Sequence, residues 1–345
     1  MQLPYDAILL VAFGGPEGPD EVMPFLENVL RGRRVPRQRI EEVAAHYFHF
    51  GGVSPINAQC RELIEALQSA MQARSWRLPV YWGNRNWHPL LEDTLRRMAD
   101  DGVRRAVAVI TSAYSSYSSC RQYLENIEAA RKAVGHLAPT VDRIRPYFNH
   151  PAFVEAWTER LAETLQRLPD SESERWHVLF TAHSIPLAMA ERCDYERQLR
   201  DVATCLSERL NIPRWNLVYQ SRSGPPEQPW LEPDVCDFVR QTLTKSALSH
   251  VVVAPIGFLS DHMEVLYDLD VELKQVCDEL GITMLRAQTV GSHPRFVEGL
   301  LDLVEERLGL RQDHPVVGRL PARPLDCPSD CCPSGRPTLT PSQGS

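Results

Sequence analysis

Short runs of Val, Ile, Leu and Phe alternate along this chain with longer segments in which apolar residues recur at helical spacing. Continuous apolar runs are typical of strands buried on both faces of a parallel sheet, and amphipathic segments are typical of the helices that cover such a sheet. The pattern predicts strands near residues 7–13, 79–84, 105–110, 142–144, 176–182, 216–220, 250–255 and 283–286.

Helical spacing fills the intervals between these strands. The predicted helices cover residues 20–31, 58–73, 89–100, 119–134, 151–168, 194–209, 234–245, 261–280 and 294–310. Because the strand–helix rhythm runs through one half of the chain and then repeats, we predict an α/β fold of two similar doubly wound, Rossmann-like domains with four-stranded parallel sheets. The domains span residues 1–148 and 149–310, with a boundary in the proline-flanked segment 146–151.

Residues 311–345 differ from the rest of the chain. They contain seven prolines and little periodicity, so we expect an irregular, partly disordered tail that only a bound ligand would pin. Cys327, Cys331 and Cys332 crowd into this tail. Three thiols do not complete a four-thiolate metal site, so such a site requires a fourth ligand from the body of the chain. Unused or redox-active thiols are the alternative explanation.

The composition excludes several classes of protein. Of the 345 residues, 43% are hydrophobic and 24% are charged, as in globular proteins. The formal charge of −8 gives no electrostatic reason to expect nucleic acid or an anionic membrane surface as a partner. No apolar stretch reaches the ~18 residues that span a bilayer, and residues 1–19 lack the features of a signal peptide. We therefore expect a cytoplasmic protein with reduced cysteines.

Ligands of open α/β sheets bind beyond the carboxyl ends of the strands, and His183 lies at such an end. An imidazole there suits proton transfer or metal binding, although a single histidine of this kind is more often structural. Farther along the chain, Glu264, Asp268 and Glu272 recur every four residues and share one face if their segment is helical. A bound divalent cation is one explanation of this row, and a solvated acidic surface is the other.

Three further segments have both a functional and an ordinary explanation. Gly14, Gly15 and Gly18 lack dinucleotide-binding spacing, which disfavours a nucleotide-dependent oxidoreductase and favours a tight turn. The tyrosines and serines of residues 113–123 suit either stacking on a flat aromatic ligand or helix capping. A basic patch suits either a polycarboxylate ligand or a solvated turn, and it consists of Arg31, Arg33, Arg34, Arg37 and Arg39.

Six ordered motifs are spread over the chain. They are FGGPEGP (13–19), FLENVLRGR (25–33), GGVSPIN (51–57), AHSIP (182–186), YQSRSGPPEQPWLEP (219–233) and GFLSDHMEVLYDLD (257–270). Together these motifs resemble the ferrochelatases, which insert Fe²⁺ into a porphyrin in haem synthesis. The resemblance extends from about residue 8 to residue 308, is strongest to the bacterial branch that metallates coproporphyrin III, and implies a class II chelatase-like fold.

The resemblance assigns roles to particular residues. His183 and Glu264 match the pair that contacts iron and takes part in removing the pyrrole protons, and Asp268 and Glu272 continue the acidic row as a metal path. The expected porphyrin contacts are Phe13, Arg31, His46, Tyr47, Ser54, Tyr117 and Tyr123. Phe13 is a departure, because related enzymes often carry at that position a tyrosine that can ligate product iron.

Some members of the family bind a [2Fe-2S] cluster through one body cysteine and three C-terminal cysteines. Cys120 matches the body position, and Cys327, Cys331 and Cys332 supply the others. The resemblance thus predicts insertion of Fe²⁺ into coproporphyrin III to give coprohaem. Action on protoporphyrin IX, or a non-enzymatic haem or porphyrin carrier, are the alternatives. We expect a monomer, with the next enzyme of haem synthesis as a candidate partner.

Overall fold

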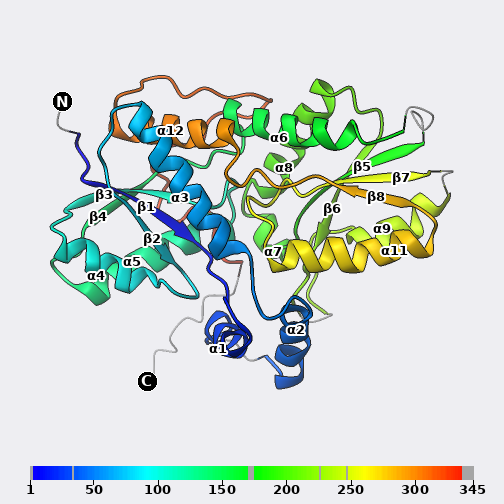
Figure 1. Cartoon of the computed structure of the whole chain (residues 1–345), viewed down its shortest axis with the longest axis horizontal. Helices are drawn as coiled ribbons and strands as arrows, with labels where there is room; N and C mark the ends of the chain where they lie inside the picture. Colours follow the sequence, from blue (N-terminus) through cyan, green and yellow to red (C-terminus); the bar gives the residue numbers. More distant parts are fainter. Residues whose placement is uncertain (1–2, 33–34, 170–174, 225–226, 246–247, 336–345) are drawn as a thin grey trace, which may run out of the picture.

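The computed structural model describes residues 3–32, 35–169, 175–224, 227–245 and 248–335. It contains two four-stranded sheets in which all paired strands are parallel. The predicted α/β class with two similar sheets is therefore confirmed. Figure 1 shows the two sheets side by side, with helices on both faces of each.

The two sheets have the same topology. The first has the order β2-β1-β3-β4 and contains β1 (Ala7–Ala12), β2 (Val80–Asn84), β3 (Arg105–Ile110) and β4 (Thr140–Arg143). The second has the order β6-β5-β7-β8 and contains β5 (Trp176–His183), β6 (Trp215–Gln220), β7 (His250–Ala254) and β8 (Thr283–Arg286). In both sheets the first strand along the chain lies in the interior, so its carboxyl end opens onto the position expected for a ligand.

The helices of the first half are α1 (Pro19–Val29), α2 (Arg37–His49), α3 (Ile56–Ala73), α4 (Leu91–Asp100) and α5 (Gln122–Val134). Those of the second half are α6 (Pro151–Leu165), α7 (Leu187–Ala190), α8 (Tyr195–Arg209), α9 (Val235–Gln241), α10 (Met263–Val265), α11 (Lys274–Glu279) and α12 (Pro294–Leu308). Within the described ranges, other helical geometry occurs in the π-helices η1 (Tyr117–Arg121) and η4 (Leu266–Leu273) and in the 3₁₀-helix η3 (Leu243–Lys245). Among the described residues, no helix is both long and apolar enough to cross a membrane.

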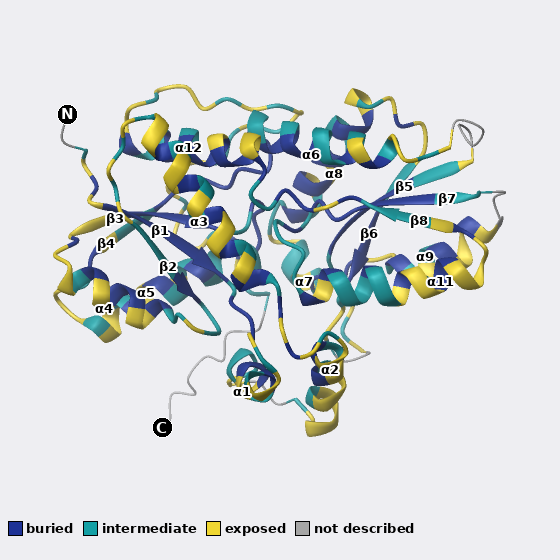
Figure 2. Cartoon of the chain, in the orientation of Figure 1, coloured by how far each residue is buried: buried dark blue, intermediate teal, exposed yellow. Residues whose placement is uncertain are grey.

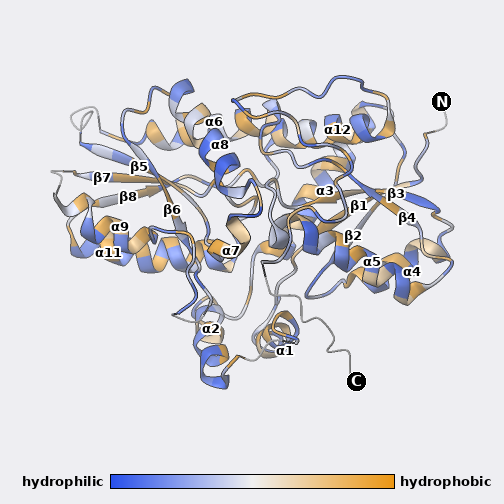
Figure 3. Cartoon of the chain, turned by 180° about the vertical axis from the view of Figure 1, so that it is seen from behind, coloured by the Kyte–Doolittle hydropathy of each residue, from blue (hydrophilic) through white to orange (hydrophobic). Residues whose placement is uncertain are grey.

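Strand β1 shows why the sequence folds into layers. All its residues are buried, and alternate side chains point to opposite faces. Ile8 and Leu10 pack in the cluster that contains residues of α3 and α12, whereas Leu9 packs in the cluster that contains residues of α4 and α5. An apolar run without polar alternation is what a strand covered on both faces requires. Figure 2 shows the inner strands β1, β3 and β7 as mainly buried and the outer faces of the helices as exposed. Figure 3 shows hydrophobic residues concentrated in the middle of the two sheets.

Helix α12 links the two halves of the chain. It follows the last strand but packs against α6 and also against α3 of the first half. One apolar cluster contains residues of both sheets, including Leu10 and Phe180, so the core is continuous. At the crossing of α6 and α12, a Cβ on Gly299 would lie 2.6 Å from the Cβ of Ala152, so only glycine permits this approach. The division at residues 148 and 310 stays a prediction.

The expectation that only a ligand would pin the tail is wrong for its described part, residues 311–335. Polar side chains of the body hold it instead: Asn149 donates to the carbonyl of Leu320 at 2.8 Å, and Asp201 accepts from the backbone of Arg319 at 2.9 Å. Arg307 donates to the carbonyl of Leu325 at 2.6 Å. The tail is irregular, as predicted, because these bonds replace secondary structure in satisfying its backbone. Residues 336–345 lie outside the described part.

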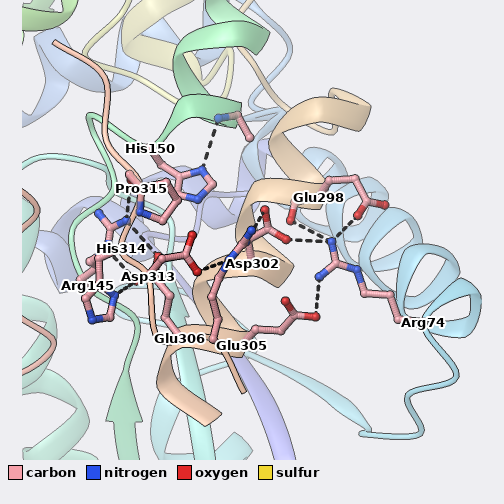
Figure 4. Close-up of polar contacts among 12 residues, drawn as sticks. Arg74, Arg145, His150, Glu298, Asp302, Glu305, Glu306, Asp313, His314 and Pro315 are labelled. Carbon is pink, nitrogen blue, oxygen red and sulfur yellow. Dashed lines mark hydrogen bonds and ion pairs between the residues drawn. The ribbon is translucent and has the colours of Figure 1, made fainter. Parts of the chain in front are cut away.

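A buried ion pair stabilises the junction of α12, the tail and the segment after β4. The Nε of Arg145 lies 2.7 Å from a carboxylate oxygen of Glu306, and both side chains are fully buried. The same carboxylate pairs with His314, and Arg145 donates to the carbonyl of Pro315. Figure 4 shows these groups converging on one side of α12.

We expect Arg145→Met to lower the free energy of unfolding by about 3–5 kcal/mol, because Glu306 would remain as a buried and uncompensated charge. Chemical denaturation measures this loss. The double variant that also carries Glu306→Leu should recover most of it, because both charges are then absent. Equal losses in the single and double variants would contradict the explanation.

Candidate functional site

His183 and Glu264 come from different strand ends and meet in space. His183 is the last residue of β5, and Glu264 lies in α10, beyond the loop that follows β7. Strands β5 and β7 are adjacent and parallel, so their carboxyl ends lie at the same edge of the sheet. The Nε2 atom of His183 is 3.7 Å from Oε2 of Glu264. The two residues singled out in the sequence are therefore brought together.

Local hydrogen bonds fix the histidine. Its carbonyl accepts from the hydroxyl of Tyr195 at 3.1 Å, and the backbone of Ser184 donates to Gln220 on the neighbouring strand at 2.8 Å. The Nδ1 atom of His183 lies 2.5 Å from the carbonyl oxygen of Ser184. A carbonyl only accepts, so Nδ1 carries the proton and the lone pair of a neutral ring is on Nε2, toward Glu264.

The three predicted acids interact with one another. The pKa of Asp268 is raised to about 7, chiefly by burial and also by the charges of Glu264 and Glu272, while hydrogen bonds from Ser221 and Gln220 oppose the shift. Ser221 and Gln220 lie at the carboxyl end of β6, so a third strand end contributes to the site. A row of carboxylates with one such raised pKa is an arrangement that a cation would stabilise.

The expected helix over residues 261–280 is correct in extent but not in type. Residues Leu266–Leu273 form a π-helix between α10 and α11, so the backbone bonds of this part do not follow the α-helical pattern. Asp268 lies in this π-helix, and Cys120 lies in the other π-helix, η1. π-Helical turns are rare and occur frequently at functional sites, and the sequence pattern does not distinguish them from α-helix.

Helices α1 and α2 pack against the segment that carries Glu264. Met263 belongs to an apolar cluster with Phe25 of α1 and Tyr47 of α2, and Phe13 packs against the same cluster. The imidazole of His46 stacks on the ring of Tyr267, with centroids 3.7 Å apart and planes within 9°. Burial lowers the pKa of His46, and the nearby charge of Arg39 lowers it further. His46 and Tyr47 thus lie near Glu264, and Phe13 packs on the same cluster as Tyr47. Their roles as porphyrin contacts stay predictions.

Helix α2 was not expected from the sequence. Only Ala44 and Tyr47 are buried among its residues, so it lacks the wide apolar stripe by which a helix is recognised. The short helix α7, directly after the AHSIP motif, was also missed, and none of its residues is buried.

The other expected porphyrin contacts occupy different surroundings. Ser54 is buried, and its backbone donates to the carbonyl of Pro16, so the GGVSPIN and FGGPEGP motifs lie against each other. Tyr123 is only 5% exposed in the core of the first half, with the guanidinium of Arg85 4.4 Å from its ring centroid. The hydroxyl of Tyr117 donates to Glu125 at 2.9 Å. The roles of these three residues in binding stay predictions.

The basic patch is a surface feature in its described part. Arg31 is exposed just beyond α1. On α2, Arg37 pairs with Glu41 at 3.0 Å and Arg39 pairs with Glu42 at 2.9 Å. Arg33 and Arg34 lie outside the described residues. The acids on α2 offset part of the positive charge on which the polycarboxylate explanation depends.

Gly14 confirms that the first glycine-rich segment is a tight turn. Its φ of +84° is strained for any residue with a side chain, and a Cβ there would lie 2.9 Å from the Cβ of Asn84. The turn leads into α1, which begins with Pro19 at its first position rather than with a capping side chain.

The four cysteines of the expected cluster lie near one another, and two of them contact the same arginine. Arg143, at the end of β4, donates to the sulfur of Cys120 at 3.2 Å and to that of Cys327 at 2.9 Å. The pKa of Cys332 is raised to about 12, chiefly by burial and also by the nearby Cys120 and Cys331. The donor set suits iron–sulfur chemistry, since it is all thiol. However, no three or more His, Cys, Asp or Glu side chains within the described ranges are arranged to hold a metal ion.

All nine cysteines are free, as expected. Two cavities lie elsewhere in the molecule. A small one is lined by Cys120, Arg143 and Arg145, and a groove lies between the N-terminal ends of α6 and α12. Neither includes His183 or Glu264, so the candidate site is defined by its converging side chains.

The comparison with protein families matches the ferrochelatase family over residues 5–308, which includes His183, Glu264 and both sheets. The chain belongs to the ferrochelatase family. The resemblance seen in the sequence is thereby confirmed for nearly the whole folded part.

Two relatives illustrate the similarity of this family member to known proteins. The protein named ferrochelatase from Rhodopirellula baltica is 55% identical over 329 residues, which cover 95% of this chain and 93% of the relative. The coproporphyrin III ferrochelatase of Streptomyces coelicolor is 49% identical over 356 residues, which cover 97% of this chain and 95% of the relative.

Solved structures of more distant proteins share the fold of this ferrochelatase-family chain. SirB from Bacillus subtilis with Fe³⁺ has a TM-score of 0.52 at 14% identity, and the match covers 87% of this chain and 94% of that one. DR2241 from Deinococcus radiodurans, described as structurally similar to chelatases, has a TM-score of 0.53 at 16% identity. The match covers 89% of this chain and 56% of DR2241. These matches support the chelatase-like α/β fold.

Several residues at the site of this ferrochelatase-family chain were not singled out in the sequence. His262 accepts from the backbone of Glu264 at 3.2 Å and so caps the short helix that carries it. Tyr267 stacks on His46, and Ser221 bonds to Asp268. The sequence feature that could have identified them is their position directly after a strand end or inside the GFLSDHMEVLYDLD motif. Their contacts depend on segments far apart in the sequence.

The raised pKa of Asp268 predicts a dependence of stability on pH. The folded state holds this proton more tightly than the unfolded chain, whose pKa is near 3.8, so the stabilisation is complete below that value and is lost as the pH rises toward 7. The free energy of unfolding of the metal-free protein should therefore fall by roughly 1.4 kcal/mol per pH unit from about pH 5 to about pH 7 because of this group. Asp268→Asn should remove that part of the slope in chemical denaturation. Parallel pH profiles for the two proteins would contradict the assignment.

Proposed function

We propose that this chain inserts Fe²⁺ into coproporphyrin III to give coprohaem. The observation that supports this most strongly is the approach of His183 to Glu264 at 3.7 Å, beside a row of carboxylates. Family membership and the high similarity to proteins named coproporphyrin III ferrochelatase support the same reaction. A non-enzymatic porphyrin carrier needs an aromatic binding surface but has no use for such a row of acids.

Metal insertion makes two demands on the protein. The two pyrrole protons of the porphyrin must leave, and the hydrated Fe²⁺ must lose its water and reach the ring nitrogens. Nε2 of His183 has the free lone pair of a neutral imidazole, so it is the group that accepts a proton. Glu264 faces it with carboxylate oxygens, which are suitable ligands for an incoming divalent cation.

The remaining acids provide a path toward Glu264. Glu272 is exposed and Asp268 is half-buried, and the charge of Glu272 contributes to the raised pKa of Asp268. A cation moving from Glu272 past Asp268 to Glu264 meets a carboxylate at each step, and its charge relieves their mutual repulsion. Above pH 7 Asp268 is charged and ready to receive a cation, so binding of Fe²⁺ to the path should weaken as the pH falls below that value.

The aromatic side chains near the site are proposed to hold the ring. Phe13 and Tyr47 pack around the same apolar cluster as Met263, next to Glu264, and His46 stacks on Tyr267. Binding energy from such contacts can offset the strain of a nonplanar ring, in which the nitrogen lone pairs are accessible. Coproporphyrin III has four propionates and protoporphyrin IX has two. The exposed guanidinium of Arg31 can bind a propionate, which favours the substrate with four. Phe13 has no ligand atom, so it contributes packing alone.

We expect His183→Ala to lower the rate of Fe²⁺ insertion by roughly 10²- to 10⁴-fold, because it removes the proton acceptor. Glu264→Gln should have a comparable effect by removing the carboxylate. Loss of porphyrin fluorescence on addition of Fe²⁺ without oxygen measures the rate, and quenching of protein fluorescence measures porphyrin binding, which should remain. Wild-type turnover should be faster with coproporphyrin III than with protoporphyrin IX.

Arg74→Gln serves as a control, because Arg74 directly follows the C-terminal end of α3 and pairs with carboxylates of α12. Near-normal turnover of His183→Ala would exclude the assigned role. A wild-type protein that binds the porphyrin but does not metallate it would favour a carrier.

We also propose that Cys120, Cys327, Cys331 and Cys332 hold a [2Fe-2S] cluster. Support comes from the proximity of the four thiols, two of which contact Arg143, and from the position of Cys120 in η1. A bound [2Fe-2S] cluster would supply iron–thiolate bonds that connect the C-terminal tail to the body of the chain. The body already holds the tail through Asn149 and Asp201, so these thiols are brought close without a ligand. The cytoplasmic location, the monomeric state and contact with the next enzyme of haem synthesis stay predictions.

Protein purified without oxygen should be coloured, with visible absorption bands that Cys332→Ser removes. Cys205→Ser is the matched control, because Cys205 lies on α8 and is not one of the four proposed ligands, so its replacement should leave the bands intact. Absorption spectroscopy and iron analysis give the result. A colourless wild type, or a Cys332→Ser variant with unchanged bands, would count against the cluster.

A further inference from the structure

The segment that carries Glu264 is unusually acidic. Residues 260–272 contain five carboxylates and neither Lys nor Arg. The structure divides the five into two groups. Glu264, Asp268 and Glu272 form the row of the proposed metal site, whereas Asp261 and Asp270 bond to one arginine from outside the segment, Arg286.

Arg286 binds both aspartates at once. Its Nε and Nη2 atoms donate to the two carboxylate oxygens of Asp270 at 2.7 and 2.9 Å, and its Nη1 donates to Asp261 at 2.6 Å. The side chain of Arg286 is 14% exposed, so these bonds are well shielded from water. A two-pronged contact of this kind fixes geometry as well as charge, which a lysine at the same position does not do.

The two aspartates flank Glu264. Asp261 precedes it in the loop after β7, and Asp270 follows it in η4. Arg286 is the last residue of β8, which pairs with β7, so the anchor comes from the rigid sheet beside the loop. The backbone of Asp261 also donates to Gln59 of α3 at 2.9 Å, and His262 caps the helix that carries Glu264.

We propose that Arg286 is a positioning residue for metal insertion, which fixes Glu264 opposite His183 by holding both flanks of the acidic segment to the end of β8. The proposal rests on the proposed function of His183 and Glu264. Arg286 also offsets one of the two negative charges on the aspartates that do not belong to the row, so most of the negative charge left over in the segment lies on Glu264, Asp268 and Glu272.

The proposal predicts a selective defect. Arg286→Gln should lower kcat/KM for Fe²⁺ by roughly 10- to 100-fold, the range found when groups that orient metal ligands are removed. Porphyrin affinity should stay within about twofold, because Arg286 acts on the acidic segment. Arg286→Lys keeps the charge but not the fork, so its defect should lie between those of wild type and Arg286→Gln. The measurements are initial rates over a range of Fe²⁺ concentrations without oxygen and fluorescence titration with coproporphyrin III.

Arg74 offers a matched control. Like Arg286, Arg74 pairs with several carboxylates, at 3.0 Å to Asp302 and at 3.0 Å to Glu305. Figure 4 shows that these pairs connect the end of α3 to α12. None of these residues belongs to the proposed site. Arg74→Gln should therefore reproduce any general loss of stability without changing kcat/KM for Fe²⁺. If Arg286→Gln does not fold, Asp261→Asn and Asp270→Asn remove the two arms of the clamp one at a time. Each should show a smaller defect of the same selectivity.

Two failures are distinguishable. If His183→Ala and Glu264→Gln abolish turnover but Arg286→Gln behaves like Arg74→Gln, the positioning role is wrong and the proposed function stands. The same conclusion follows if Arg286→Gln weakens porphyrin and iron equally, or if both aspartate variants keep normal rates. If the wild type inserts no iron, the proposed function fails and the role of Arg286 fails with it.

Discussion

Mutual repulsion among carboxylates is the constraint on which the site depends. Burial, which is the largest cause, and the charges of Glu264 and Glu272 together raise the pKa of Asp268 to about 7. Such an arrangement lowers the stability of the empty protein and favours a cation that neutralises it. Nε2 of His183 adds a group that, in the neutral ring, is both a metal ligand and a proton acceptor, without adding negative charge. The chemistry of iron insertion requires both properties at one place.

The rest of the molecule provides the rigidity that this repulsion demands. The core runs without a break from one sheet to the other, and α12 returns from the second half to pack on α3. Bonds across the two halves, such as that from the hydroxyl of Tyr114 to the carbonyl of Ile256 at 3.0 Å, hold the loop after β7 to the first half. The segment that carries Glu264 is thus supported from the first half, from β8 and from α1 and α2.

The sequence predicted the layers of the fold well, because buried parallel strands have an unmistakable apolar pattern. It also paired His183 with Glu264, through the resemblance of their motifs to those of the ferrochelatases, and the structure brings the two side chains together at the ends of strands β5 and β7. It did not predict α2, whose buried face consists of two residues, or the π-helix around Asp268, which shares the spacing of an α-helix. The anchoring of the tail was missed because Asn149 and Asp201 are far from it in the sequence. Arg286 was missed for the same reason, since its aspartate partners lie on another element.

The most direct test of the account is a crystal structure of the protein with coproporphyrin III and a divalent metal bound. The account predicts that the ring lies against α1 and α2 and that its metal centre lies between Nε2 of His183 and the carboxylate of Glu264. A ring bound elsewhere, or a metal centre that neither residue approaches, would contradict it.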